Sequence, residues 1–214
     1  MKTDRLIEML ATGVEPVRPG AASRRLAASL LVGLPLAVGW MLFEYGIRRD
    51  LIQSMFYPMF WIKLLFPISV AFAAFVWAQR AARPGAPVSR SIVATATPFV
   101  LMVLLGLGAW LAAPSTERPA LVLGQTWRSC VFNIAAISLP IFVAAMIAMK
   151  GLAPTSPSLA GAAAGLMASG AGAAVYALHC PELAAPFLAV WYVIGMLLPA
   201  AVGASIGSRL LRWA

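Results

Sequence analysis

Residues 159–178 (LAGAAAGLMASGAGAAVYAL) and residues 187–206 (FLAVWYVIGMLLPAAVGASI) are two apolar runs separated by the short loop HCPELAAP. Each run has about the 20 residues that a helix needs to cross the hydrocarbon layer of a bilayer. The two runs therefore predict a hairpin of membrane-crossing helices. The loop between them contains His179, the only histidine of the chain, and Cys180, one of its two cysteines.

The composition extends this interpretation to the whole chain. Apolar residues make up 62% of the sequence and charged residues 11%, with a mean hydropathy of +0.89, whereas soluble domains have about 45–50% apolar and about 25% charged residues. The sequence therefore predicts an all-α membrane protein, a bundle of six transmembrane helices in a lipid bilayer. The predicted spans are residues 26–43, 58–77, 92–112, 131–149, 159–178 and 187–206.

The basic residues are distributed unevenly between the two sides of the predicted bundle. Loops rich in Lys and Arg usually face the cytoplasm, so both termini are predicted to be cytoplasmic. The net charge of +9 is divided among short loops and forms no single patch, so we predict no direct binding to nucleic acid. The side of the termini has eleven basic residues, Lys2, Arg5, Arg18, Arg24, Arg25, Arg80, Arg83, Arg90, Lys150, Arg209 and Arg212, and the opposite side has four, Arg48, Arg49, Arg118 and Arg128.

The chain divides into a cytoplasmic segment (1–25), a transmembrane domain (26–206) and a basic cytoplasmic tail (207–214). Within the first segment, residues 3–11 predict a short helix that has Leu6, Met9 and Leu10 on its apolar face and Ile7 at the edge of that face. Such a face either lies on the bilayer as an interfacial anchor or docks a protein partner. The pattern favours neither of these interpretations.

Several classes of function lack the residues that they need. The predicted spans contain no Asp or Glu, which proton-driven pumps usually require. The chain has no H-E-x-x-H zinc motif, no G-x-S-x-G motif, no phosphate-binding P-loop and no C-x-x-C pair. We therefore predict that the protein is not an enzyme and uses no cofactor. Lys63, the one cation inside a span, is expected to extend towards the lipid head groups.

Two isolated cysteines remain as candidates for a functional site. Cys130 lies at the lip of the fourth span and Cys180 in the last loop, so the predicted topology places both on the outward side. Three interpretations stay open: a structural disulfide, a thiol switch, or two unrelated buried cysteines. In a switch, oxidation or a soft metal ion would change the thiols, with His179 as a possible third ligand. Glu182 is a further candidate ligand, but we expect it to be a solvated loop charge.

Small residues predict close helix packing in the last two spans. Gly161 and Gly165 form a small-xxx-small pair, and Gly203 and Gly207 form another. Such pairs let helix backbones approach closely, so these two spans are predicted to pack as a tight antiparallel hairpin. Asn133, three residues after Cys130, is expected to bond a neighbouring helix.

The sequence also resembles a known family. The stretches that carry the resemblance are MKTDRLI at the N-terminus, ALHCPE at 177–182, Trp191-Tyr192 and GSRLLRW at 207–213, together with six spans and a cysteine that opens the fourth. They are similar to the negative regulator of sigma-F family (NrsF), bacterial integral-membrane anti-sigma factors.

The resemblance implies a protein of the bacterial inner membrane that holds an extracytoplasmic-function sigma factor inactive in the cytoplasm. It also implies that Cys130 and Cys180 belong to the stress response that releases the sigma factor. The prediction that Leu6, Ile7 and Leu10 contact the sigma factor rests on the amphipathic pattern alone.

Two other functions stay open at this stage. A small-solute transporter or channel with a structural disulfide would contain a polar, water-lined path. A membrane thiol oxidoreductase would turn over quinone or dithiol substrates. A sensor needs an input on one face of the membrane and an output on the other, and outward thiols with an inward apolar-faced segment fit that need.

Overall fold

The computed structural model describes residues 3–12, 20–152 and 154–212, and every regular element within them is a helix. Six helical segments of the described chain are long and apolar enough to cross a membrane. The predicted all-α fold with six transmembrane helices is therefore confirmed. Five of these segments contain α2 (Ala21–Glu44), α4 (Pro58–Ala81), α5 (Ser89–Ala112), α7 (Trp127–Lys150) and α8 (Pro157–Tyr176), and the sixth consists of α9 (Ala185–Phe187), the π-helical turn η1 (Leu188–Tyr192) and α10 (Val193–Leu210).

Several helices extend beyond the apolar runs that predicted them. Helix α4 continues through Gln79 and Arg80, and α7 begins at Trp127, four residues before the predicted span. Polar residues at the ends of a span reach the head-group region, where their side chains remain hydrated. One consequence is that Cys130 lies in the first turn of α7 and not in the loop before it.

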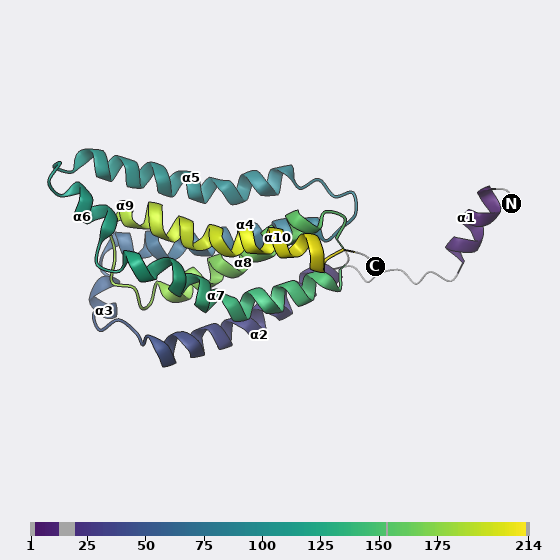
Figure 1. Cartoon of the computed structure of the whole chain (residues 1–214), viewed down its shortest axis with the longest axis horizontal. Coiled ribbons are helices and arrows are strands. Elements are labelled where there is room, and N and C mark those ends of the chain that lie inside the picture. Colours follow the sequence, from purple (N-terminus) through teal and green to yellow (C-terminus); the bar gives the residue numbers. More distant parts are fainter. Residues whose placement is uncertain (1–2, 13–19, 153, 213–214) are drawn as a thin grey trace.

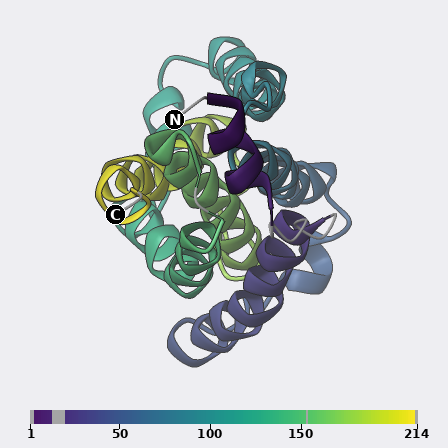
Figure 2. The ribbon, with the colours of Figure 1, turned by 90° about the vertical axis from the view of Figure 1, so that its right-hand side faces the viewer.

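Helix α8 lies at the centre of the bundle. It packs against α10, α4 and α7, and in the end-on view of Figure 2 the other long helices surround it. In its most apolar 18-residue window 78% of the residues are buried, against 17% in α5. Helix α5 runs along one edge of the bundle in Figure 1 and presents most of its apolar side chains outward.

The predicted contact between the glycine pairs is confirmed. A Cβ atom on Gly161 would collide with the backbone of Gly203, and one on Gly165 would collide with the carbonyl of Pro199. On another side of α8, a Cβ on Gly172 would meet Ser138 of α7. Helix α8 is built of Ala and Gly because neighbouring backbones pack directly against its own.

The loops divide between two ends of the bundle. The α2–α4, α5–α7 and α8–α9 loops lie together at the left in Figure 1, where the short helices α3 (Leu51–Ser54) and α6 (Arg118–Leu123) also lie. The start of α2 and the end of α10 lie at the opposite end. We call the first end the cysteine end, since Cys130 and Cys180 are both there. The structure thus groups the loops as the alternation of spans predicted.

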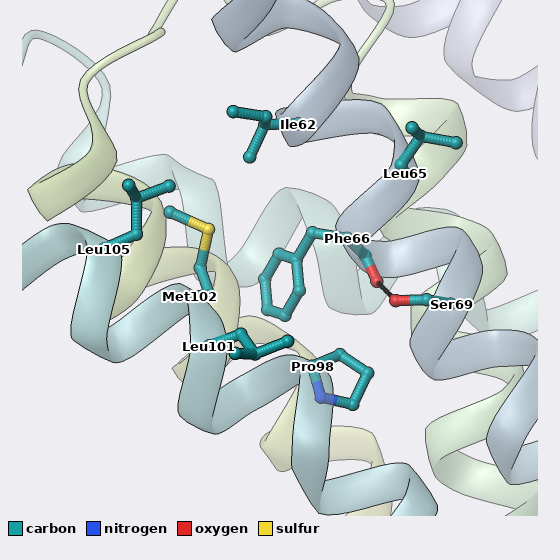
Figure 3. Close-up of a pocket in the computed structure, with 8 residues that line it drawn as sticks. All are labelled: Ile62, Leu65, Phe66, Ser69, Pro98, Leu101, Met102 and Leu105. Carbon is teal, nitrogen blue, oxygen red and sulfur yellow. Dashed lines mark hydrogen bonds between the residues drawn. The ribbon is translucent and has the colours of Figure 1, made fainter.

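A groove between α4 and α5 faces outward from the bundle (Figure 3). The hydroxyl of Ser69 donates a 2.6 Å hydrogen bond to the carbonyl oxygen of Phe66, so the one polar side chain of the lining already has a partner. The groove is therefore lined almost entirely by apolar side chains. Its lining consists of Ile62, Leu65, Phe66, Ser69, Pro98, Leu101, Met102 and Leu105.

Candidate functional site

The loop that carries Cys180 begins as a continuation of α8. The N–H groups of His179 and Cys180 both donate to the carbonyl oxygen of Tyr176, at 3.0 Å in each case. Pro181 follows, and because proline has no N–H it cannot extend this pattern. Cys180 is therefore fixed at the end of α8, directly before the chain turns towards α9.

The two cysteines belong to one buried cluster. The side chains of Cys130 and Cys180 both have 0% exposure, and both are free thiols in this structure. The backbone of Tyr176 accepts the hydrogen bond of the Cys180 N–H, the Tyr176 hydroxyl is bonded to Asn133, three residues after Cys130, and its ring centroid is 6.0 Å from that of Tyr192. We call Cys130, Tyr176, Cys180 and Tyr192 the thiol cluster. The structure thus brings together the two cysteines that the sequence singled out.

A hydrogen bond joins the thiol cluster to the helix that carries Cys130. Asn133 Nδ2 donates to the Tyr176 hydroxyl at 3.5 Å, which links α7 to α8 as expected of this asparagine. The hydroxyl of Tyr192 is also buried and has no hydrogen-bond partner among the described residues. The cluster is therefore a small polar region inside an otherwise apolar bundle.

Lys63 lies beneath the cysteine loop, and the expectation that it extends to the head groups is wrong. Its side chain has 0% exposure. The ammonium donates to the carbonyl oxygens of Cys180 at 2.6 Å and Glu182 at 2.8 Å, and lies 5.7 Å from the ring centroid of Tyr192. Charge-assisted hydrogen bonds and the aromatic face offset the cost of burying the cation, so Lys63 turns inward instead of outward.

Arg48 holds the same loop from the α2–α4 connection. Its Nη1 donates to the carbonyl oxygen of Cys180 at 3.2 Å, and its backbone N–H donates to Leu178 at 3.1 Å. Nε and Nη2 each donate to the Asp50 carboxylate at 2.7 Å. This fork of hydrogen bonds raises the pKa of Arg48 and lowers the pKa of Asp50 to about 2. Both cations at Cys180 therefore bind its backbone carbonyl.

Glu182 is not the solvated loop charge that we expected. Its Oε1 accepts hydrogen bonds from the backbone N–H of Gln125 at 2.6 Å and of Thr126 at 3.2 Å, with the Thr126 hydroxyl at 3.4 Å. These groups directly precede α7, so the carboxylate caps the start of that helix, where the helix dipole favours a negative charge. Glu182 thus ties the Cys180 loop to the helix that carries Cys130.

His179 supports the loop from its other neighbours. Its Nδ1 donates to the carbonyl oxygen of Gly46 at 3.0 Å, and its ring lies 5.3 Å from Tyr45 and 5.8 Å from Tyr176, centroid to centroid. Within the described residues, no group of three or more His, Cys, Asp or Glu side chains is placed to hold a metal ion. The interactions of His179 are those of a residue that orients the loop.

The predicted partner-binding residues lie away from this site, on helix α1 (Thr3–Ala11). Leu6 is 42% exposed and Ile7 is 59% exposed. The side chain of Leu10 lies outside the described part of the structure. The apolar side of α1 that the sequence predicted thus presents at least two large side chains to its surroundings.

Sequence reasoning missed Lys63, Arg48 and Glu182 as parts of the site. The rarity of charged residues in this sequence could have indicated two of them. Lys63 is the only cation inside a predicted span, and Glu182 is the only acidic residue after Glu117. Charged groups in so apolar a chain are costly unless they have partners. The identity of those partners, all distant in sequence, appears only in the folded chain.

Comparison with known proteins places the chain among relatives of matching length. The family model described as negative regulator of sigma F matches residues 10–213. A protein of Azospira oryzae named probable anti-sigma-F factor NrsF is 43% identical over 213 residues, with 100% of both chains covered. The anti-sigma-F factor NrsF of Caulobacter vibrioides is 36% identical over 222 aligned positions, again with 100% of both chains covered. No solved structure matches.

Proposed function

The chain belongs to the negative regulator of sigma F family, and we propose that it is an anti-sigma factor of the bacterial inner membrane. In this proposal it sequesters an extracytoplasmic-function sigma factor and releases it when Cys130 and Cys180 respond to oxidative or metal stress. The names of the two relatives support the anti-sigma role. The observation that supports the sensing role is the thiol cluster, which brings both cysteines of the chain together at one end of the bundle.

The charge distribution supports an orientation in which the cysteine end faces away from the cytoplasm. Within the described residues, the opposite end contains Arg24, Arg25, Arg80, Arg83, Arg90, Lys150 and Arg209, and the positive-inside rule expects such an excess on a cytoplasmic side. At the cysteine end, Arg48 is held by Asp50, and Arg118 donates to carbonyl oxygens of Leu111 and Ala113. These two arginines have partners within the fold, whereas Arg83 and Arg90 at the other end are exposed.

Helix α1 is the proposed sigma-factor contact. It presents Leu6 and Ile7 to its surroundings, and nine residues are too few for a helix that is stable by itself in water. An amphipathic helix of this kind gains stability when its apolar side enters a groove of a partner protein. We therefore assign Leu6, Ile7 and Leu10 to the surface that the sigma factor covers.

The proposed signal passes along α7 and α8. Cys130 lies in the first turn of α7, Cys180 lies at the end of the turn that continues α8, and both helices run to the opposite end of the bundle. A change in the state of the thiols would alter how these helices pack against each other and against α10. A coupling of about 1–3 kcal/mol between the two ends would change the occupancy of the sigma factor by roughly 5- to 150-fold.

Copurification tests the anti-sigma role. Full-length protein is isolated from membranes, and bound sigma factor is identified by mass spectrometry, for the parent and for Leu6→Asp, Ile7→Asp and Thr12→Asp. Thr12 lies on the opposite side of the helical wheel from Leu6 and Leu10, so Thr12→Asp adds the same charge as a matched control. We expect the parent and Thr12→Asp to retain the sigma factor and the other two variants to lose it. Absence of any sigma factor from the parent would remove the anti-sigma proposal, and full retention by Leu6→Asp and Ile7→Asp would remove only the role of α1.

A reporter of sigma-dependent transcription tests the sensing role. Cys130→Ser and Cys180→Ser are compared with the parent before and after treatment with an oxidant or a thiol-binding metal ion. Ser129→Ala, a change next to Cys130 at an exposed residue, serves as the control. We expect both cysteine variants to lose the induced response while the control keeps it. Parental induction in both cysteine variants would reduce the cysteines to a structural role.

A further inference from the structure

We propose that Lys63 and Glu182 are positioning residues of the cysteine pair, which lock the loop of Cys180 to the first turn of the helix that carries Cys130. This inference rests on the proposed function of the two thiols and adds residues that act through them. These contacts keep Cys130 and Cys180 in a fixed position relative to each other, so that the two thiols react with each other as a pair. We call Lys63, Glu182 and the backbone of Thr126 the cysteine clamp.

The first half of the clamp is the ammonium of Lys63. Among the described residues no carboxylate forms an ion pair with it, and it donates instead to two carbonyl oxygens that lie two residues apart, those of Cys180 and Glu182. A buried cation is costly unless hydrogen bonds satisfy it. Two carbonyls that converge on one ammonium fix the turn between them, so Lys63 sets the backbone conformation on both sides of Pro181.

The second half is the carboxylate of Glu182. It accepts from the N–H of Thr126 at 3.2 Å, and the carbonyl oxygen of Thr126 in turn accepts from the N–H of Cys130 at 3.0 Å. A continuous series of hydrogen bonds therefore runs from Lys63 through Glu182 and Thr126 to Cys130. The same Lys63 also binds Cys180 directly, so both cysteines are bonded to the clamp through their backbones.

Gly124 keeps the space that the clamp needs. It has a φ of +53°, and a Cβ atom there would lie 2.6–2.8 Å from the carboxylate atoms of Glu182. Any side chain at this position would displace the carboxylate. Gly124→Ala therefore perturbs the clamp without changing a cysteine or a clamp residue.

The test measures how fast the two thiols join in the purified full-length protein in detergent micelles. Diamide, a neutral two-electron oxidant, takes one hydrogen from each thiol: an S–S bond forms, and the N=N bond of diamide is reduced to a hydrazine. Remaining thiols are counted by alkylation after denaturation, because both are buried in the fold. The variants are Lys63→Met, Glu182→Gln and Gly124→Ala. Their matched controls are Lys150→Met at an exposed lysine, Glu117→Gln at an exposed glutamate, and Gly108→Ala at a glycine with open space.

We expect the three clamp variants to slow disulfide formation by roughly 10- to 100-fold, the size of effect that follows when reacting groups are displaced by about 1 Å. A second readout separates positioning from general loss of structure. In variants that retain a single cysteine, N-ethylmaleimide should alkylate the remaining thiol at least as fast when the clamp is perturbed as when it is intact. The controls should match the parent in both readouts.

Unchanged or faster disulfide formation in the clamp variants overturns the inference, as does a fall in disulfide formation that the alkylation rate follows. Gly124→Ala and Glu182→Gln keep the test valid if Lys63→Met fails to fold. No sigma factor is present in these measurements, so they succeed or fail independently of the reporter assay. Loss of the stress response with intact clamp kinetics would instead point to the output end of the protein.

Discussion

The ammonium of Lys63 lies 2.6 Å from the carbonyl oxygen of Cys180, so a cation of the second membrane-spanning helix holds the loop between the fifth and sixth. The ammonium of Lys63 thereby connects the second span to the loop that joins the fifth and sixth spans. This bond links residues that are 117 positions apart in the chain, and it is the kind of contact that decides how a loop at the end of a bundle is oriented.

Lys63→Met is expected to destabilise the bundle. The substitution keeps the length of the side chain, but it leaves the carbonyl oxygen of Glu182 without its buried donor and that of Cys180 with Arg48 alone, which costs about 1–3 kcal/mol. Unfolding by sodium dodecyl sulfate in mixed micelles measures the change. Lys150→Met, at an exposed position, should leave the free energy of unfolding within experimental error of the parent. A Lys63→Met variant as stable as the parent would contradict this assignment.

Gly161→Ala is expected to disturb the contact between α8 and α10. Its Cβ would collide with the backbone of Gly203, and a rigid backbone cannot move aside as a flexible side chain does. Overpacking of this kind costs about 1–3 kcal/mol. Gly108→Ala, where nothing lies within 4 Å of the new atom, is the control in the same unfolding assay. Equal stability of the two variants would show that the close approach is not needed.

The Arg48–Asp50 ion pair predicts a pH dependence confined to acid. The pKa of Asp50 is lowered to about 2 by the guanidinium, against about 3.9 for an ordinary aspartate. A lowered carboxylate pKa contributes stability above the ordinary value, and this contribution is lost as the pH falls from about 4 towards 2. The difference in melting temperature between the parent and Asp50→Asn should be constant from pH 8 to about pH 5 and shrink below pH 4. A difference that changes near neutral pH would count against this pair.

The orientation of the bundle predicts where added thiols react. In a Cys130→Ala, Cys180→Ala background, Ser115→Cys and Ser89→Cys each place one exposed thiol, the first at the cysteine end and the second at the opposite end. A membrane-impermeant maleimide applied to spheroplasts should label Ser115→Cys directly and Ser89→Cys only after the membrane is opened. The reverse pattern would mean that the thiol cluster faces the cytoplasm and would remove the proposed direction of signalling.

Hydropathy and helix length were sufficient to predict the six spans, and the spacing of small residues predicted the glycine contact between the last two. Both depend on residues that are close in sequence or repeat along one helix. The surroundings of two charged residues at the cysteine end, Lys63 and Glu182, were predicted wrongly for the opposite reason. Lys63 and Glu182 were each judged by their own surroundings in the chain, while their partners come from distant loops. The ammonium of a lysine near the end of a span can lie either among the lipid head groups or inside the bundle. In this protein the carbonyl oxygens that bind it inside the bundle are brought together only by the fold.

The sequence did predict that Cys130 and Cys180 lie at the same end of the bundle, since the alternation of spans determines which loops are neighbours. Their burial with Tyr176 and Tyr192 required knowledge of how α7, α8 and η1 are rotated about their axes, which depends on side-chain packing across three helices. The π-helical turn at Leu188–Tyr192 has no sequence signature that we recognised, and it carries one of the two tyrosines of the cluster.

At Gly161, Gly165 and Gly170, the backbone of α8 packs against the backbones of its neighbours without long side chains between them. Long side chains accommodate a displacement by changing rotamer, whereas peptide groups in direct contact have no rotamers to change. The helix is about 30 Å long, and its first residue, Pro157, touches Gly207 near the end of the chain. We therefore expect a displacement of a fraction of an ångström at the C-terminal end of α8, near Cys180, to be transmitted to its N-terminal end with little loss.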